Sequence, residues 1–378
     1  MPKHGLWFHC ASVGEVITLL PLLKDLHQNA PQLKFIVTTN TDTGSRIVKR
    51  QDLDYLFHSY LPFDWVSSIS RFIGTTQPTA LYVMETEIWP NLFTVCHNDE
   101  IPVRIINARL SSKTTSANSW IKALLKTALS RVTAVYARTE KDAEAYAQLG
   151  AAEDIVTNTG NLKLTTVLSY GQENENQGET EIDTAGREYV LVASTHENEE
   201  LQIYRIWQQL DRDELLIIAP RHPERSASII KQLSCRHIAV RSKQQAITAE
   251  TKVFLLDSIG ELNSYFPHAK LVIMGGSFVA VGGHNILEPA SANRAIITGP
   301  YMENFTEELA LMLDSNAIIQ LSSYEEIGDC LNRLLNNDAD RLSLQENTCD
   351  LTKSAEGILE NYSAIILKQL NEADITNQ

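Results

Sequence analysis

Short apolar segments alternate with helix-like segments along the whole chain, and this alternation is what most restricts the possible folds. In the first half, strands are expected at residues 6–10, 35–39, 55–61, 80–84, 103–107 and 133–137. Helices are expected between them, including residues 16–28, 120–129 and 140–149. Strands that alternate with helices pair in parallel through right-handed crossovers. The pattern predicts an α/β fold with a doubly wound parallel sheet.

The second half repeats this alternation after a segment of different character. Residues 169–188 contain six acidic residues, one arginine and little that a core could bury, which is typical of a solvated linker. Beyond it, strands are expected at residues 189–193, 215–219, 237–240, 253–256, 271–274, 295–298 and 317–320. We therefore expect an N-terminal domain over 1–168 and a second α/β domain over 189–353. The apolar spacing of residues 354–378 predicts a helix that packs back on the N-terminal domain.

The segment 271–290, LVIMGGSFVAVGGHNILEPA, is the strongest candidate for a ligand site. Two glycine pairs follow an apolar strand, and Asn285 is placed to cap a helix that begins at about Ile286 and carries Glu288 within reach of a ribose. Bare backbone and the first helical N–H groups favour a phosphate. The alternative is an ordinary turn that uses glycine for positive φ. Because the fingerprint G-x-G-x-x-G is absent, we expect a nucleotide with few phosphates.

The net charge of −15 is unevenly distributed. Residues 1–165 contain 16 Lys and Arg against 15 Asp and Glu, so the second half carries the negative excess. That excess argues against general nucleic-acid binding, whereas the first half can present a local basic face to an anionic substrate. The five scattered cysteines include no C-x-x-C pair and predict reduced thiols in a cytosolic protein. We expect neither a signal peptide nor a membrane-spanning segment.

Three glutamates follow strands of the first half. Glu15 lies at the first strand–helix junction, where it is either a general base or a helix-capping acid whose pKa the helix dipole would lower. Glu85 and Glu87 follow the strand at 80–84 and would face the same sheet edge as Glu15. The alternative for this pair is a helix N-terminus with Pro90 in the first turn.

Three more loops follow strands of the second half and would meet the glycine segment at one sheet edge: STHE at 194–197, PRHPER at 220–225 and DSIGEL at 257–262. Arg221 and Arg225 offer guanidinium groups for a phosphate or a sugar carboxylate. The alternative is a surface ion pair of these arginines with Glu224 or Glu197. The third loop, at 257–262, is placed to hold the base and the ribose of a nucleotide.

A metal site is not expected. His196, His222 and His284 come from three different loops and lack the i, i+4 spacing of metal ligands. The run 211–213, Asp-Arg-Asp, has the acid spacing of metal-dependent transferases, but it precedes a strand and so lies at the wrong sheet edge. We interpret it as a solvated turn.

Several motifs, in order along nearly the whole chain, resemble those of the Kdo transferases, which add 3-deoxy-D-manno-octulosonic acid (Kdo) to the lipid A precursor of Gram-negative outer membranes. The motifs are HCASVGE at 9–15, TNTDTGS at 39–45, METEIWPNL at 84–92, NARLS at 107–111, TGNLK at 159–163, STHENEE at 194–200, PRHPER at 220–225, DSIGEL at 257–262 and GGSFVAVGGHNILEP at 275–289. The resemblance implies the GT-B glycosyltransferase fold, in which two Rossmann-like domains face each other across a cleft.

The resemblance also implies an inverting, metal-independent transfer of Kdo from CMP-Kdo to the glucosamine 6-hydroxyl of lipid IVA, with release of CMP and no cofactor. Glu15 would be the general base, with Glu85 and Glu87 beside it and Lys163 on the Kdo carboxylate or the leaving phosphate. The donor would be held by Ser194, Thr195, His196, Arg221, His222, Ser258, Gly260, Glu261, Gly275, Gly276, Ser277, Gly283, His284, Asn285 and Glu288. The acceptor would be held by Ser12, Gly14, Thr43, Gly44, Ser45, Arg46 and Arg109.

Kdo transferases usually begin with a membrane anchor ahead of the first motif, and this sequence shows none. We expect an enzyme at the cytoplasmic face of the bacterial inner membrane that makes peripheral contact with it. The segment 113–131, with Trp120, Lys122 and Lys126, either lies on anionic lipid or is a domain helix with a basic solvent face.

Two other functions remain open. A nucleotide-sugar epimerase has the same two-domain design but takes a diphosphate donor and needs no acceptor, so release of free CMP would separate it from a transferase. A two-lobed binding protein would hold its ligand without turnover, although reduced cysteines and the missing signal peptide argue against a periplasmic one. An NAD enzyme is disfavoured by the missing glycine fingerprint.

Overall fold

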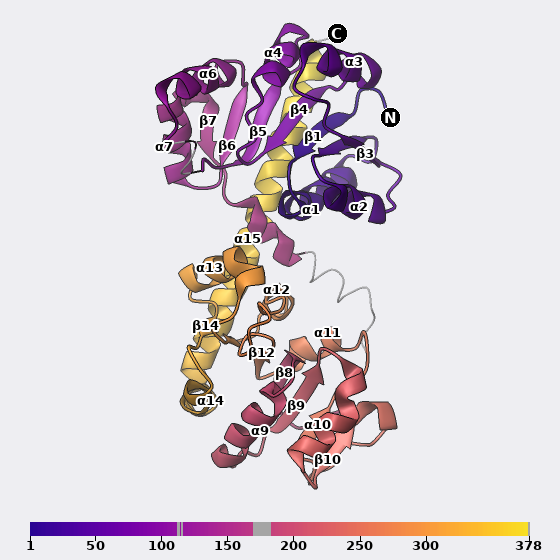
Figure 1. The fold of residues 1–378 in the computed structure, drawn as a ribbon, viewed down its shortest axis with the longest axis vertical. Coiled ribbons are helices and arrows are strands. Elements are labelled where there is room, and N and C mark those ends of the chain that lie inside the picture. Colours follow the sequence, from indigo (N-terminus) through magenta and orange to yellow (C-terminus); the bar gives the residue numbers. More distant parts are fainter. Residues whose placement is uncertain (112–113, 115, 169–182, 377–378) are drawn as a thin grey trace. The chain divides into compact units, whose positions relative to one another are not determined.

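The structure is a computed structural model that describes residues 1–111, 114, 116–168 and 183–376, with side chains through residue 372. It divides into two compact units (Figure 1), of which the first comprises Met1–Thr166 and Glu356–Gln378 and the second Val167–Ala355. Most of the expected linker over 169–188 lies outside the described residues.

The first unit is built on a parallel sheet of seven strands in the order β3-β2-β1-β4-β5-β6-β7. These strands are β1 (Leu6–Cys10), β2 (Phe35–Thr39), β3 (Leu56–Tyr60), β4 (Ala80–Met84), β5 (Val103–Ala108), β6 (Ala134–Ala137) and β7 (Val156–Asn158). The helices between them are α1 (Val13–Asn29), α2 (Asp42–Arg50), α3 (Val66–Thr76), α4 (Pro90–Asn98), α6 (Ser119–Leu129) and α7 (Glu140–Leu149). Alternate residues of β1 enter two cores, so that Phe8 packs with α1 on one face and Trp7 with α3, α4 and α6 on the other.

The second unit holds another parallel sheet of seven strands, in the order β10-β11-β9-β8-β12-β13-β14. The strands are β8 (Tyr189–Thr195), β9 (Leu215–Pro220), β10 (Ile238–Val240), β11 (Val253–Leu255), β12 (Leu271–Met274), β13 (Ile296–Thr298) and β14 (Ile319–Gln320). The helices are α9 (Glu199–Leu210), α10 (Ser226–Leu233), α11 (Leu262–Tyr265), α12 (Leu287–Ser291), α13 (Thr306–Asp314) and α14 (Glu325–Asn336). The expected α/β class with two doubly wound parallel sheets is confirmed.

Helix α1 begins earlier than expected, at Val13, because the Ser12 side chain accepts the N–H of Glu15. Helix α2 starts at Asp42, because the Thr41 side chain accepts the N–H of Gly44. Strand β7 was not expected, since its three residues are half-buried or exposed and give no apolar run.

The last helix, α15 (Asp338–Thr376), is 39 residues long and starts well before residue 354. The boundary between the two units falls inside it. Tyr362 and Ile366 are buried in the core of the first unit, with the yellow helix of Figure 1 lying along the sheet there. The Tyr362 hydroxyl accepts the N–H of Asn107 at 3.2 Å and thereby ties α15 to β5. No helix within the described residues is long and apolar enough to cross a bilayer.

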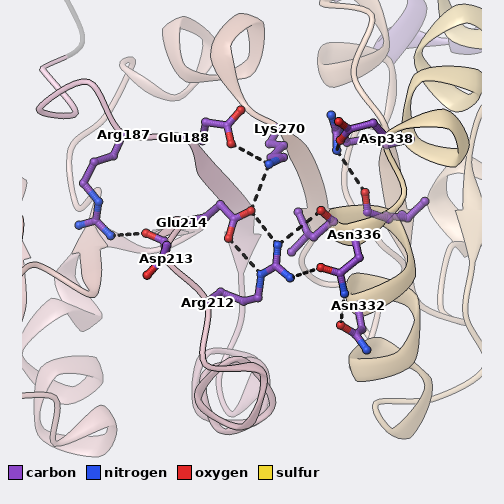
Figure 2. Close-up of polar contacts among 12 residues, drawn as sticks. Arg187, Glu188, Arg212, Asp213, Glu214, Lys270, Asn332, Asn336 and Asp338 are labelled. Atoms are coloured by element: carbon purple, nitrogen blue, oxygen red, sulfur yellow. Dashed lines mark hydrogen bonds and ion pairs between the residues drawn. The ribbon is translucent and has the colours of Figure 1, made fainter.

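Charged side chains cluster where β8, β9 and β12 begin, at the amino-terminal edge of the second sheet (Figure 2). Arg212 donates to both carboxylate oxygens of Glu214, at 3.1 and 3.0 Å, and to Asn336 at 2.5 Å. Lys270 bridges Glu214 and Glu188 at 3.1 and 2.7 Å. Because only 17% of the Arg212 side chain is exposed, the interpretation of 211–213 as a solvated turn is wrong for its central residue.

Candidate active site

Glu15 lies in the first turn of α1, at the carboxyl edge of the first sheet. Its carboxylate accepts the N–H of Ala11 at 2.8 Å and the hydroxyl of Ser12 at 2.9 Å. Only 7% of the residue is exposed. Burial raises the pKa of Glu15 to about 7, the bond from Ala11 opposes this rise, and the charges of Glu85 and Glu87 add to it. The expected lowering of this pKa by the helix dipole is therefore wrong in sign, because loss of hydration outweighs the dipole.

Glu85 is the more buried acid of the second motif and already has a cation. It is 3% exposed, adopts a positive φ of 54°, and lies 2.6 Å from Nε of Arg109, which follows β5. The Tyr146 hydroxyl is 2.9 Å from the carbonyl of Glu85 and 3.3 Å from that of Arg109, which fixes both loops. Arg109, expected to bind the acceptor, is thus also the counter-charge of Glu85.

Glu87 is half-buried and lies in the loop between β4 and α4. Its carboxylate accepts the indole N–H of Trp89 at 2.9 Å. Helix α4 begins at Pro90, as the structural alternative for this motif required. Both interpretations of the motif are therefore compatible with the structure, since the acids lie in the loop and the helix follows them.

The remaining residues expected at the acceptor lie on helices α1 and α2. Gly14, Thr43 and Arg46 are exposed, and Arg46 pairs with Asp42 at 2.5 Å. Gly44 and Ser45 are buried, with the Ser45 hydroxyl 3.3 Å from Nδ1 of His58. The Ser45 hydroxyl thus faces inward, which argues against contact with an acceptor. Lys163 is half-buried in the segment Leu162–Thr165.

In the second unit, the structure brings together the three histidines from separate loops. Nε2 of His196 and Nε2 of His284 are 2.8 Å apart, so one of these nitrogens donates to the other. The ring centroid of His222 lies 5.7 Å from that of His196. Burial lowers the pKa of His284 to about 4, and the positive charges of His196, Arg221 and His222 contribute to the shift. Arg221 is exposed and has no ion pair within the described residues.

The N–H groups of three of the four paired glycines are already hydrogen-bonded. The N–H groups of Gly275, Gly276 and Gly283 donate to Ala193 O, Glu199 Oε2 and Gly276 O, at 2.7, 2.7 and 2.9 Å. The Ser277 hydroxyl is buried between Met274 O and the N–H of Gly299. These three glycine N–H groups are therefore already engaged within the protein. A Cβ on Gly275 would lie 2.6 Å from Cα of Thr195, so close packing explains this glycine.

Helix α12 begins at Leu287, one residue later than expected, with Ile286 in the cap position. Asn285 still contributes, because its Oδ1 accepts the N–H of Leu287 and its Nδ2 donates to Glu288, both at 3.1 Å. The Asn285 side chain thus caps α12 and also contacts Glu288.

The other residues expected at the donor differ in their accessibility. Thr195 is fully buried, and its hydroxyl donates to Glu200 at 2.8 Å, whereas Ser194 is half-buried with a φ of 56°. Arg225 binds Glu200 with two bonds of 2.9 and 3.1 Å, so its acidic partner is Glu200 rather than the expected Glu224 or Glu197. Glu261 is held by Arg241 at 2.6 Å and by the Ser258 hydroxyl, next to the exposed Gly260.

Sequence reasoning missed several buried polar residues that organise these loops. Glu199 is fully buried and accepts three backbone N–H groups, from His196, Gly276 and Phe278, at 2.7, 2.7 and 3.1 Å. His9, fully buried in β1, lies 3.9 Å from Glu87. His9 lies inside the motif HCASVGE and Glu199 inside STHENEE. Their place in these motifs was the one sequence signal that could have identified them. Within the described part of the chain, no three acidic, histidine or cysteine side chains are arranged to hold a metal ion.

Comparison with known proteins gives a consistent set of relatives. The family model of 3-deoxy-D-manno-octulosonic-acid transferase (kdotransferase) matches residues 1–166. The chain is 35% identical to the 3-deoxy-D-manno-octulosonic acid transferase of Haemophilus influenzae, over 95% of this chain and 86% of that protein. It is 30% identical to the same-named protein of Rickettsia felis, over 97% of this chain and 79% of that protein.

Solved structures show where the fold recurs. UDP-GlcNAc 2-epimerase from Neisseria meningitidis superimposes with a TM-score of 0.57 at 14% identity, over 97% of this chain and 100% of that one, so the two share a fold. The C-terminal CMP-Kdo binding domain of WaaA from Acinetobacter baumannii is 31% identical, over 51% of this chain and 98% of that one, with a TM-score of 0.41.

Proposed function

Because this chain belongs to the 3-deoxy-D-manno-octulosonic acid (Kdo) transferase family, we propose that it transfers Kdo from CMP-Kdo to the 6-hydroxyl of lipid IVA and releases CMP. It is a glycosyltransferase with the GT-B fold. The epimerase alternative shares this fold, but the sequence relationship is to transferases.

The raised pKa of Glu15 is the observation that supports the proposed mechanism. A carboxyl with a pKa of about 7 is half deprotonated near neutral pH and is basic enough to accept a proton from a sugar hydroxyl. As this proton moves to Glu15, the hydroxyl oxygen bonds to the anomeric carbon of Kdo. The bond from that carbon to the CMP phosphate oxygen breaks, and the electron pair leaves with CMP. A single displacement of this kind inverts the anomeric configuration.

The phosphate of the donor is proposed to bind at the histidine cluster of the second unit. Arg221 and His222 are exposed there, and His196 and His284 share one proton between their Nε2 atoms. The Arg221 guanidinium supplies positive charge and the imidazole rings supply N–H donors to a leaving phosphate, a role that a metal ion has in other transferases. Lys163 is proposed to contact the Kdo carboxylate or the same phosphate.

Membrane contact is proposed for the face of α6. Trp120 is 67% exposed and Leu124 46%, and Lys122 is exposed on the same helix. An aromatic anchor next to lysines suits an anionic lipid surface. Cosedimentation with anionic vesicles, lost on Trp120→Ala, would place the enzyme at the inner membrane, whereas equal sedimentation of both proteins would contradict this contact.

Mass spectrometry of the reaction products tests the proposed function. The protein is incubated with CMP-Kdo and lipid IVA in EDTA, beside the Glu15→Gln variant. We expect lipid IVA to gain one or more Kdo masses, with equimolar CMP, and the variant to form less than about 1% of the product. Transfer that EDTA abolishes would contradict metal independence. CMP release without a glycosylated lipid would contradict the proposed acceptor.

A further inference from the structure

Glu199 is a fully buried carboxylate at the start of α9, in the unit that carries the histidine cluster. Its Oε2 accepts the N–H groups of His196 and Gly276, each at 2.7 Å, and its Oε1 accepts the N–H of Phe278 at 3.1 Å. Backbone N–H groups that converge on one point are the arrangement by which many proteins bind a phosphate or another small anion. Here the anion at that point is a side chain of the protein itself.

The backbone bonds of Glu199 distinguish it from the next acid along the chain. Burial raises the pKa of Glu199, and the three backbone N–H groups oppose this rise. Glu200 is equally buried, but the guanidinium of Arg225 donates to both of its oxygens, at 2.9 and 3.1 Å. Glu199 therefore fixes the main chain of the loops that it touches, whereas Glu200 fixes a side chain.

One oxygen of Glu199 joins the two loops that carry His196 and His284. Oε2 binds the N–H of His196 on one side and the N–H of Gly276 on the other. Gly276 in turn accepts the N–H of Gly283 at 2.9 Å, and a Cβ on Gly276 would lie 2.7 Å from Cδ2 of His284. The distance of 2.8 Å between the Nε2 atoms of the two histidines thus depends on where Glu199 holds Gly276.

We propose that Glu199 is a positioning residue of the donor site, which occupies the anion position between the two loops and thereby holds His196 against His284 where the phosphate of CMP binds. The role toward CMP rests on the proposed function, whereas the contact between the two rings is a property of the folded chain. The three backbone N–H groups are then not available to the phosphate. It is bound by side chains instead, namely the histidine pair and the exposed Arg221 and His222.

The affinity of the full chain for CMP, measured by calorimetry, tests this role. The Glu199→Gln variant keeps the size of the side chain but replaces one acceptor oxygen by an NH₂ group, which faces a backbone N–H and repels it. We expect CMP to bind at least about fivefold more weakly to Glu199→Gln than to the unmodified protein. Equal affinity of the two proteins would overturn the proposal.

Glu214 provides the matched control, because it is a buried acid of the same unit at the opposite edge of the sheet. It accepts hydrogen bonds from the side chains of Arg212 and Lys270 (Figure 2). Glu214→Gln makes the same chemical change and should leave the affinity for CMP within about twofold. A loss of affinity as large as that of Glu199→Gln would mean that any destabilisation of this unit weakens CMP binding, and the positioning role would be refuted.

Rescue by formate tests whether an anion is needed at this point. Glu199→Ala removes the carboxylate and leaves space for a small one, so formate should restore part of the lost CMP affinity in a saturable manner. Sodium chloride at the same ionic strength should not, and formate should not strengthen CMP binding to the unmodified protein. Equal effects of formate and chloride on Glu199→Ala would contradict the proposal.

Nitrogen NMR reads the contact between the two rings without any nucleotide. The protein is labelled with ¹⁵N-histidine, and His284→Gln identifies the signals of the pair by their loss. An N–H···N bond gives a scalar coupling between the two Nε2 atoms, which we expect in the unmodified protein and in Glu214→Gln but not in Glu199→Ala. A coupling that persists in Glu199→Ala, or its absence from the unmodified protein, would overturn the proposal. Failure of the unmodified protein to bind CMP would instead refute the proposed function, and the coupling would still decide whether Glu199 holds the rings together.

Discussion

The Ser12 hydroxyl donates to the Glu15 carboxylate at 2.9 Å, and the Glu15 N–H donates back to the same hydroxyl at 3.2 Å. This reciprocal pair caps α1 and also fixes the rotamer of the carboxylate. Helix capping and general-base catalysis were treated as alternatives from the sequence. In the structure one geometry serves both, because the cap holds a buried carboxylate at the carboxyl edge of the sheet.

Replacing Glu15 by Gln should change how stability depends on pH. The pKa of Glu15 rises from 4.5 to about 7 on folding, so the folded state holds the proton more tightly. Stability is therefore lost as the pH rises from about 4.5 to 7, by up to about 3 kcal/mol. Glu15→Gln cannot ionise and should gain in thermal midpoint over the unmodified protein between pH 5 and 8. Parallel midpoints across this range would contradict the buried, weakly acidic Glu15.

Removing Arg109 should destabilise the first unit. Arg109→Ala leaves the 3% exposed Glu85 without its counter-charge, and we expect a loss of about 2–4 kcal/mol, moderated by the partial exposure of Arg109. Denaturant unfolding measures this loss of folding free energy. Adding Glu85→Gln to Arg109→Ala should recover part of the loss, since the buried charge is then gone. A double variant less stable than the single one would show that Glu85 is not the cause.

An alanine at Gly276 should disrupt the histidine cluster. Gly276 has a φ of 66°, and a Cβ there would lie 2.7 Å from Cδ2 of His284. We expect a stability loss of at least about 1 kcal/mol and a weaker affinity for CMP by calorimetry. Gly74→Ala is the control, because its Cβ would meet nothing within 4 Å in α3 and should be neutral or stabilising. Unchanged CMP affinity in Gly276→Ala would show that the histidine cluster is not part of the donor site.

Glu214 should contribute to stability only above acidic pH. Burial alone would raise its pKa, but hydrogen bonds from Arg212 and Lys270 lower the pKa to about 2 (Figure 2). The contribution is therefore present above about pH 4.5 and is lost as the pH falls toward 2, by about 1–3 kcal/mol. Glu214→Gln should lower the thermal midpoint at pH 7 and hardly at all at pH 2. Glu188→Gln, at the exposed end of the same network, should change little at either pH.

The strands were predictable because parallel strands buried on both faces read as continuous apolar runs. All five residues of β1 are buried, and so are the four of β12. Strand β7 was not predicted because Thr157 and Asn158 are polar and exposed and Val156 is only half-buried. The early start of α1 could have been predicted from the sequence, since Ser12 and Glu15 have the spacing of a capping box.

The position of the loops that carry the candidate site was predictable, and the hydrogen bonds within these loops were not. The expected loops lie at the carboxyl edges of the two sheets, where parallel topology puts them. The partners of Glu199 and Glu200 were not predictable, because Gly276 and Arg225 are distant in sequence and meet them only through folding. The sign of the Glu15 pKa shift failed for the same reason, since burial is a property of the tertiary structure.

The pH dependence of a single turnover tests the central claim most directly, namely that Glu15 is the base with a pKa near neutrality. Enzyme in excess is mixed with CMP-Kdo and lipid IVA, and the rate of glycosylated lipid formation is measured from pH 5 to 9. The account predicts a rate that rises about tenfold per pH unit and levels off near pH 7, and a rate in Glu15→Gln at least about a hundredfold lower without this rise. A profile that is flat through pH 7, or a Glu15→Gln variant that retains the rise, would contradict it.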